Sequence, residues 1–505
     1  VIQDQAATTL RETLRNVPGI SIQAGEGGVP AGDNLSIRGF SARSDIYQDG
    51  MRDFGSYNRD SFLLDSVEVL KGPSSALFGR GSTGGVINMV TKSPKAKAFS
   101  DGTLTVGSDN TRRATADLNK PLTESIGFRL NLMDHFNNVT GRHGAENRRF
   151  GIAPSLTFGL GQPTRLTVSF LHQNEDNTPD YGLPYVNSRP APVDKSNYYG
   201  FENNNFFKSD VDKVSLKVDH KFGNGLILRD QIQHGTYKRD FQITEAKVPV
   251  SVTPATPINI ARAQLTGSST ETSLNNDLSL SAKFATGFAT HNLIVGFEMI
   301  RETSKPKRYT FTGVPDTSLE SPFEKQSFSG SSTLTSRATA TALTSASYLA
   351  DAINLGEQWI FNAGLRSDSV KGRYRQDIGA AATNLSRSDK ELSWRTGLSF
   401  KPVQSTSLYI NYGTSFNPSI EQLTLAANTA NLDPEKSETR ELGVKSDLLN
   451  GQLTLEGAVF RLEKTNARTP DLVDPTLNVL TGKQRVDGAE ISLVGHPSSK
   501  RQISS

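Results

Sequence analysis

The chain has 505 residues, of which 55 are Lys or Arg and 52 are Asp or Glu, so its formal net charge is +3. So small a charge argues against a nucleic-acid-binding protein, and the absence of cysteine excludes a disulfide scaffold, a thiolate metal site and a cysteine nucleophile. No apolar run reaches the ~18 residues of a membrane-spanning helix. Hydropathy alone indicates a soluble protein, but a transmembrane β-barrel alternates its apolar residues and escapes hydropathy.

Residues 1–97 are predicted to form a compact α/β unit. Leu10, Leu14 and Val17 fall at helical spacing, and the Pro-Gly pair that follows ends this short helix. Glycine-rich turns then separate short β-rich pieces. These pieces are 21–23, 34–40, 45–51, 66–72 and 85–92.

From about residue 100 onward the apolar residues alternate with polar ones. Val214, Leu216 and Val218 alternate with Ser215, Lys217 and Asp219. The same pattern recurs in 292–299, 393–400 and 453–459. Each of these segments has one apolar and one polar face, which is typical of β-strands.

The connections between these segments alternate between short and long. Short turns at one end and long loops at the other are the pattern of outer-membrane barrels, and we count about sixteen strands, with an error of about two. A sheet in hydrocarbon closes on itself because an open edge leaves backbone groups unsatisfied. The short connections are 222–225, 285–290, 402–406 and 448–452, and the long ones are 177–212, 240–271, 303–345, 371–391, 417–439 and 466–486.

Such a wide barrel cannot fill its lumen with its own side chains, so the lumen is either a channel or plugged. The N-terminal unit has about the size of a plug. Its stretch DSVEVLKGPSSALFGRGSTGGVINMVTK, Asp65–Lys92, resembles the plug-domain signature of TonB-dependent outer-membrane receptors. NVPGISI from Asn16, NLSIRGF from Asn34 and IYQDGMRD from Ile46 are similar to the same domain in the same order.

The later segments resemble the strands of the same family. They begin at Ser393, Leu432 and Gly482. The resemblance implies a mainly β fold: a transmembrane antiparallel β-barrel with an N-terminal α/β plug domain inside the lumen, the plug being residues 1–97 and the barrel 98–505. It also implies a monomer that crosses the outer membrane of a Gram-negative bacterium many times and lies in its lipid.

Within the family the chain most resembles ferric-siderophore receptors, and YQDGMRDFGSYNRDSF from Tyr47 resembles the catecholate branch. The implied function is import of a ferric siderophore, energised by the TonB-ExbB-ExbD inner-membrane complex, with iron held by its chelator and no cofactor in the protein. Other cargoes stay open, namely a hydroxamate siderophore, haem, cobalamin or a glycan. A passive porin or adhesin is the alternative from another class, although a plugged lumen conducts poorly.

The resemblance also implies a charge cluster between plug and barrel. Arg38 and Arg80 lie in the plug, and Glu441 and Glu490 lie on predicted barrel strands. Arg–carboxylate pairs are directional, charge-assisted hydrogen bonds that can be broken and remade, which suits a movable anchor. The alternative is that these are ordinary polar residues facing the lumen.

Five residues between predicted plug strands form a candidate ligand site at the plug apex, which the family likeness turns toward the cell exterior. A ferric tris-catecholate is an anion with flat rings; arginine offers charge and stacking together, and aromatic side chains offer ring faces. A solvated loop is the alternative. The candidates are Arg43, Arg52, Phe54, Tyr57 and Arg59, with Asn58 as a weaker addition.

The long loop at 177–212 is rich in aromatic residues, which could contact a ligand from above. They could equally form an interfacial aromatic girdle or pack the loop on itself. The candidates for ligand contact are Tyr181, Tyr185, Tyr198 and Tyr199.

No motif indicates an enzyme or a metal site. Gly79, Gly81 and Gly84 fit G-x-G-x-x-G, but that motif needs a following helix, and the alternating sequence 85–92 predicts a strand. The seven histidines are scattered without metal-binding spacing, and no nucleophile elbow occurs. We therefore expect no catalytic residues and no protein-bound metal.

Both ends depart from the family pattern. The chain begins at Val1 without a secretory signal, and the TonB box, which the inner-membrane partner binds, would lie upstream. The family has 22 strands, so about six seem absent, and the polar end from His496 lacks alternation. We expect a truncated or frameshifted product with an unpaired sheet edge that does not function in isolation.

Overall fold

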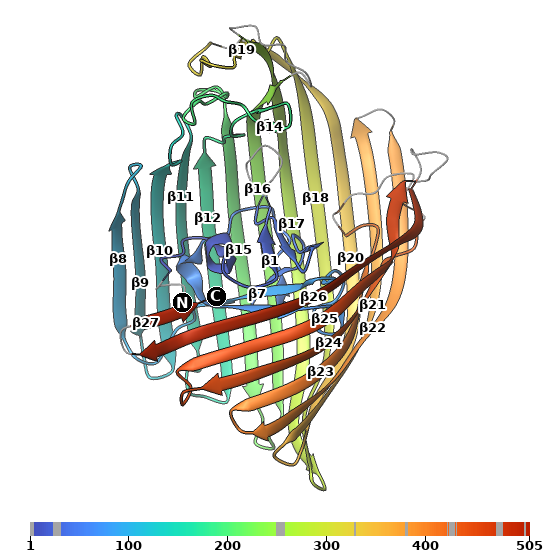
Figure 1. Ribbon diagram of the computed structural model, residues 1–505. Coiled ribbons are helices and arrows are strands. Elements are labelled where there is room, and N and C mark those ends of the chain that lie inside the picture. The colour runs from blue at the N-terminus through green and yellow to red at the C-terminus, as the bar shows by residue number, and fades with distance from the viewer. Residues whose placement is uncertain are drawn as a thin grey trace.

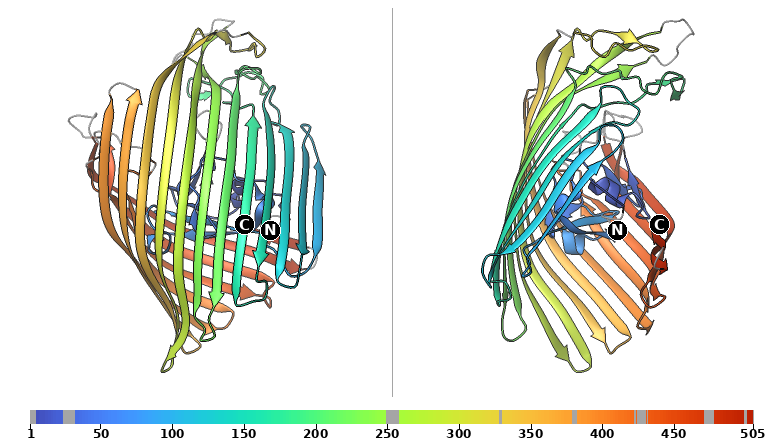
Figure 2. Two further views of the ribbon diagram at one scale, coloured as in Figure 1. Left: turned by 180° about the vertical axis from the view of Figure 1, so that it is seen from behind. Right: turned by 90° about the vertical axis from the view of Figure 1, so that its left-hand side faces the viewer.

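The computed structural model describes residues 5–23, 32–248, 258–327, 330–378, 382–421, 423, 430, 432–470, 478–498 and 501–504. Figure 1 shows a β-barrel whose interior holds the N-terminal segment, and Figure 2 shows the same arrangement from two other directions. None of the helices within these residues has the length and apolar character that crossing a membrane requires.

The N-terminal segment is a plug built from two small sheets, with strand orders β1-β2-β3 and β5-β4-β7-β6. Strand β7 directly follows the glycine-rich GRGSTG segment, so the strand predicted there is confirmed. Thr9 caps the first helix, since its hydroxyl accepts a hydrogen bond from the N–H of Glu12 (3.3 Å). The plug elements are α1 (Leu10–Leu14), β1 (Ile20–Ile22), β2 (Leu35–Ile37), β3 (Phe40–Ser41), β4 (Ile46–Gln48), β5 (Met51–Arg52), the 3₁₀ helix Ser61–Leu63, β6 (Leu64–Lys71), α2 (Ser75–Phe78) and β7 (Gly85–Thr91).

The apolar core of the molecule lies in the plug and against one part of the barrel wall. Leu10 and Leu14 of α1 pack on Ile37, Ile46 and Ile87 of the plug sheets. Met133 and Leu171 of the barrel belong to the same buried cluster. Elsewhere plug and wall meet mainly through polar side chains, which are described below.

The barrel begins at Phe99, after β7 has ended at Thr91. Within the described residues, eighteen strands follow one another in a closed ring, and sixteen of these are eight residues or longer. The ring consists of β8 (Phe99–Val106), β9 (Arg112–Pro121), β10 (Ile126–Asn138), β11 (Glu146–Phe158), β12 (Thr164–Asn177), β15 (Phe206–Lys221), β16 (Ile227–Lys247), β17 (Asn259–Thr286), β18 (Ala289–Thr312), β19 (Thr317–Ser318), β20 (Ser331–Leu355), β21 (Trp359–Ile378), β22 (Thr383–Val403), β23 (Thr406–Asn417), β24 (Glu435–Leu448), β25 (Leu453–Pro470), β26 (Asn478–Ser498) and β27 (Arg501–Ser504). A separate hairpin joins β13 (Tyr185–Val186) to β14 (Arg189–Pro190).

The predicted unpaired edge is wrong for the described residues. The short strand β27 pairs with β26 and stands next to β8 in the ring, so the strand order closes. The seam is short, because β26 and β27 share only three paired positions. Closure gives the backbone groups at the ends of the sheet partners that an open edge would lack.

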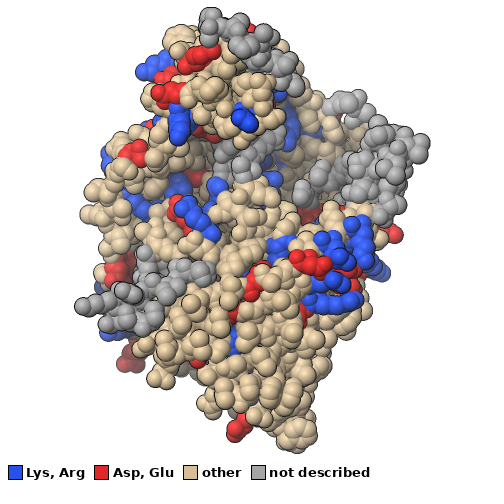
Figure 3. Space-filling model, viewed as in Figure 1, with Lys and Arg blue, Asp and Glu red and all other residues tan. Residues whose placement is uncertain are grey.

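The alternating residues divide between the two faces of the barrel wall as the sequence predicts. On β18, Val295, Phe297 and Met299 are exposed on the outer face, while Glu298 and Ile300 are buried toward the interior. The lower part of the outer surface in Figure 3 carries few charged residues. An apolar belt of this kind is the surface that a lipid bilayer covers.

Four of the predicted long loops are in large part strand. The polar stretches at 240–271, 303–345, 371–391 and 466–486 contain the upper ends of β16–β18, β20–β22, β25 and β26. At ~3.3 Å per residue, the 28 residues of β17 exceed the ~30 Å of a bilayer core. Figure 1 shows β17 and β18 rising above the neighbouring strands. We call the region between these upper strand ends and the plug the vestibule.

Candidate ligand-binding site

A first cluster of ion pairs ties the plug to β24 and β26. Arg38 lies in the turn after β2 with a positive φ of 50°, and its Nη1 lies 2.6 Å from Oε2 of Glu441. Its Nε donates to Oε1 of Glu490 at 3.1 Å, and its guanidinium carbon lies 3.7 Å from the ring centre of Phe460. Lys71, which sequence reasoning missed, also donates to Glu490, at 2.8 Å. The structure thus brings together three of the four residues implied for the cluster.

Arg80 belongs to a second cluster. It donates to Glu421 at 2.9 Å and pairs with Glu302 of β18, whereas the resemblance implied Glu441 and Glu490 as the cluster carboxylates. Arg52 shares both partners of Arg80: its Nε lies 3.3 Å from Glu302, and it also pairs with Glu421. Two buried plug arginines therefore face two barrel carboxylates.

The glycines around Arg80 serve close packing. A Cβ on Gly81, whose φ is 87°, would lie 2.3 Å from Oδ1 of Asp45. The turn therefore requires glycine for backbone approach. Burial raises the pKa of Asp45 to about 7, with an addition from the charge of Glu421, while the Ser82 N–H and Arg52 act in the opposite direction.

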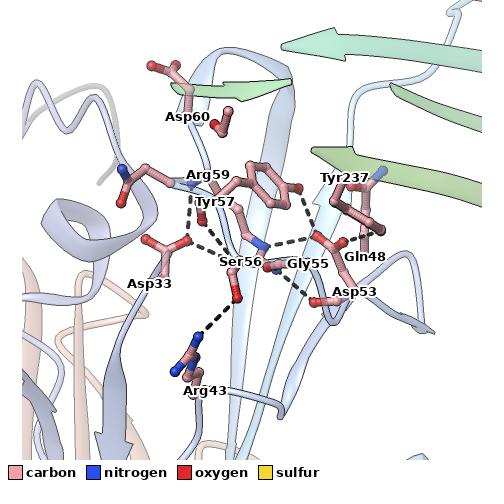
Figure 4. A network of polar contacts seen from close by, with 12 residues as sticks. Asp33, Arg43, Gln48, Asp53, Gly55, Ser56, Tyr57, Arg59, Asp60 and Tyr237 are labelled. Atoms are coloured by element: carbon pink, nitrogen blue, oxygen red, sulfur yellow. Dashed lines mark hydrogen bonds and ion pairs between the residues drawn. The ribbon is translucent and has the colours of Figure 1, made fainter. Parts of the chain in front are cut away.

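Asp53 is the centre of a third network, shown in Figure 4. Its carboxylate accepts hydrogen bonds from the hydroxyls of Tyr57 (2.8 Å) and Tyr237 (2.7 Å) and from Nε of Arg59 (2.9 Å). Lys213 of β15 lies 3.2 Å away. Burial alone would raise the pKa of Asp53, but these cations and hydroxyls outweigh it and hold this pKa well below its usual range.

Asp60, which follows Arg59 in the chain, faces the barrel wall at β9 and β11. Its carboxylate accepts hydrogen bonds from Nη1 (3.0 Å) and Nη2 (2.6 Å) of Arg113 on β9. Arg149 of β11 lies 3.4 Å from the same carboxylate. Asn58, the weaker apex candidate, donates to Glu175 of β12 at 2.8 Å. The plug is thus also joined to β9, β11 and β12.

Three of the five apex candidates are not placed for ligand contact. Arg52, Tyr57 and Arg59 are each at most 3% exposed, and all have partners inside the protein. The prediction that these three residues contact the ligand is therefore corrected. Their contacts instead fix the conformation of the apex loop. Phe54 is half-buried, with its ring 5.7 Å from that of Tyr237.

Arg43 is the exposed apex candidate. Its Nη2 donates to the hydroxyl of Ser56 at 3.0 Å (Figure 4). Its charge interacts electrostatically with Arg239 of β16. Arg239 also interacts electrostatically with Arg308 of β18 and with the carboxylate of Glu271 on β17. Nε of Arg239 is buried without a hydrogen-bond partner among the described residues. Two arginines act on one carboxylate and a third acts on Arg239, so the floor of the vestibule is basic.

Sequence reasoning missed Arg239 and Arg308, although a signal for one of them was present. Arg239 shares the parity of Gln231, Gln233 and Tyr237, which are buried on the inner face of β16. Reading that parity upward along the strand places Arg239 inside the barrel above the plug. Only the closed barrel brings it near Arg43.

The loop tyrosines have different environments. Tyr198 and Tyr199 are buried, and their hydroxyls donate to the carbonyls of Pro179 (3.0 Å) and Leu319 (2.6 Å). Tyr198 thus packs the loop on itself, one of the alternatives left open, whereas Tyr199 joins it to the neighbouring connection around Leu319. Tyr181 is half-buried beside Phe207, whereas Tyr185 on β13 is 65% exposed. Tyr185 is thus the member of the set that is open to a ligand.

Metal-binding side chains do not converge in the part of the chain that the structure describes: it holds no group of three or more His, Asp or Glu arranged to bind an ion. The arrangement found instead is a basic vestibule floor on an anchored plug.

Comparisons with known proteins match both parts of the chain. Residues 1–86 match the model described as TonB-dependent Receptor Plug Domain, and residues 151–500 match the model described as TonB dependent receptor-like, beta-barrel. The probable TonB-dependent siderophore receptor PiuA of Acinetobacter baumannii is 34% identical over 541 residues, covering all of this chain and 72% of that protein. The catecholate siderophore receptor Fiu of Escherichia coli K12 is 30% identical, again over all of this chain and 72% of that protein.

Solved structures agree with this similarity. The crystal structure of the siderophore receptor PiuA from Acinetobacter baumannii superposes with a TM-score of 0.94 at 32% identity, covering 100% of this chain and 76% of that one. The closed form of the ferric-catecholate import receptor Fiu from Escherichia coli K12 gives 0.92 at 29% identity, with coverage of 100% and 77%.

Proposed function

Because the chain belongs to the family of TonB-dependent receptors, we propose that it binds a ferric siderophore at the outer membrane of a Gram-negative bacterium and imports it. The name of the relative PiuA supports a siderophore as the cargo. We take the ligand to be a catecholate chelate, which the name of the relative Fiu supports. The chain is a transport receptor and not an enzyme. Iron is cargo held by its chelator.

The observation that carries the proposal is the basic floor of the vestibule. Arg43 and Arg239 both act electrostatically on the single carboxylate of Glu271, and Arg308 acts on Arg239, so this group of charges is positive in sum. A ferric tris-catecholate carries negative charge on oxygens flanked by aromatic rings. Guanidinium groups can donate to such oxygens and stack on such rings. Tyr185 is the loop aromatic best exposed to cover the ligand from above.

The plug closes the path below this site. Its contacts with the wall are dominated by buried ion pairs, such as Arg38–Glu441 and Arg80–Glu421. Breaking a buried pair by losing one partner costs about 3–5 kcal/mol, so several pairs together hold the plug against spontaneous release. The outer membrane has no nucleotide supply, and we therefore assign the energy for plug movement to the TonB-ExbB-ExbD complex.

Uptake by living cells tests the proposal. A host without catecholate receptors of its own would express the protein and receive radioactive iron only as ferric tris-catecholate. We expect iron accumulation and growth, both lost when TonB is deleted. Absence of uptake with this chelate and every other siderophore would contradict import.

The same assay separates the remaining alternatives. Uptake of a ferric hydroxamate, haem or cobalamin in place of the catecholate would keep the receptor and change the cargo. Uptake that continues without TonB would indicate a passive pore.

A further inference from the structure

A second cavity lies between the plug and the barrel wall, away from the vestibule. Its volume is about 440 Å³, within the ~300–1,000 Å³ of small-molecule sites. The plug contributes Arg38, Lys71 and the adjoining ends of β6 and its following turn, and β22–β26 contribute the wall. We call this cavity the chamber.

The chamber lies toward the end of the barrel that carries the short turns. Ser407 adjoins the turn at 402–406, and Lys445 and Glu456 flank the turn at 448–452. Short turns face the periplasm in barrels of this kind. A ligand leaving the vestibule along this side of the plug therefore reaches the chamber before the periplasm.

One cation of the chamber has no partner. Arg38 and Lys71 pair with Glu490, and Lys445 pairs with Glu456 at 2.9 Å. Arg395 of β22 lines the same chamber, and its guanidinium group makes no hydrogen bond or ion pair with any residue that the structure describes.

The nearest carboxylate does not neutralise Arg395. Glu441 acts on it electrostatically, but the Glu441 carboxylate already binds Arg38 at 2.6 Å and accepts the hydroxyl of Tyr409 at 2.9 Å. A half-buried guanidinium without a partner costs desolvation energy unless an anion arrives. A guanidinium group and the tyrosines Tyr409 and Tyr412 thus line one cavity.

We propose that the chamber is a second binding site for anionic catechol groups, in which Arg395 binds the ligand. The cargo occupies this site on its way from the vestibule to the periplasm. The passage of a siderophore rests on the function proposed above. The affinity of the chamber for a small anion does not, and the two are tested separately.

Introduced cysteines test the chamber directly, because the natural chain has none. Ser399→Cys places a thiol in the chamber wall, and Asn224→Cys in an exposed turn is the matched control. In the detergent-solubilised protein we measure labelling rates with methanethiosulfonates carrying either a sulfonate or an ammonium group. We expect Ser399→Cys to favour the sulfonate reagent about tenfold relative to the control. Arg395→Gln should abolish this preference, and 2,3-dihydroxybenzoate should slow labelling at Ser399→Cys alone.

Equal labelling preference at both positions, or no protection by 2,3-dihydroxybenzoate, would overturn the chamber site. Transport adds an independent test: Arg395→Gln should lower ferric tris-catecholate uptake about tenfold, the loss of one charge-assisted contact, and Arg395→Lys should restore part of it. The control is Arg440→Gln, an exposed arginine on the outer face of β24. Full uptake by Arg395→Gln would contradict the transit role. Absence of uptake by the natural chain, with the labelling result intact, would refute the proposed function alone.

Discussion

Glu490 of the barrel accepts a hydrogen bond from Arg38 of the plug, with 3.1 Å between Oε1 and Nε, although 452 positions separate them in the sequence. Both side chains are largely buried, at 11% and 1% exposure. The pair joins the first sheet of the plug to the last long strand of the barrel. It thereby fixes the plug at the wall of the chamber.

Removal of Arg38 is expected to loosen the plug. Arg38→Ala leaves Glu441 without its ion-pair partner and Glu490 with Lys71 alone, and loss of one partner of a buried pair costs about 3–5 kcal/mol. Hydrogen exchange of the β2–β3 amides should report a fall of this order in the free energy of local opening. Arg440→Ala is the control, since its exposed pair with Glu438 is worth less than about 1 kcal/mol. Equal effects of both changes would contradict the anchoring role.

Loss of Glu302 should affect the second cluster. Glu302→Gln removes a carboxylate that Arg52 and Arg80 share, leaving Glu421 as their common partner. We expect faster hydrogen exchange around α2 and more frequent channel openings in planar bilayers. A variant with the natural rate of opening would show that Glu421 suffices to hold both arginines.

The hydrogen-bond and ion-pair partners of Asp53 should differ in how much they contribute to the stability of the plug. Lys213→Met removes a buried cation 3.2 Å from the carboxylate, while Tyr237→Phe removes one neutral hydrogen bond. We expect the free energy of plug unfolding to fall by about 3 kcal/mol in Lys213→Met and by about 1 kcal/mol in Tyr237→Phe. The reverse order would contradict the assignment of Asp53 as a charged centre.

Stability of the plug should depend on pH through Asp45. The pKa of this carboxyl is about 7 in the folded protein and 3.8 when unperturbed, mainly because of burial. A group whose pKa rises on folding stabilises fully below its unfolded pKa and loses that contribution as the pH rises through the folded pKa. Asp45→Asn removes this titration. The free energy of unfolding of the variant should therefore rise relative to that of the natural protein between pH 4 and pH 7.

This relative increase in the free energy of unfolding should reach the order of 1–4 kcal/mol, because each pKa unit is worth about 1.4 kcal/mol. Urea unfolding of both proteins at several pH values measures it. A difference that stays constant with pH would show that Asp45 does not titrate in this range.

Much of the fold could be predicted because the membrane imposes a strict pattern on the sequence. Alternation such as that of Val295 and Phe297 identifies the strands where one face meets lipid. Beyond the bilayer both faces are polar, so the upper ends of β17 and β20 were taken for loops. Their backbones nevertheless stay paired with β18, with one register shift between Arg308 and Tyr309.

The site was less predictable because partners are chosen in three dimensions. Arg52 and Arg59 have the right chemistry for a ligand, but barrel and plug carboxylates bind them first. Arg43 makes no ion pair within the described part of the chain, and Arg239 and Arg308 are isolated arginines on distant strands. Their positive field exists only after barrel closure.

The most direct test of the account is the affinity of the purified protein for ferric tris-catecholate, measured by calorimetry at several salt concentrations. Each of Arg43→Gln, Arg239→Gln and Arg308→Gln should raise Kd about tenfold, and the triple variant should lose most of the salt dependence. A triple variant that binds the chelate with the affinity of the natural protein would contradict the account.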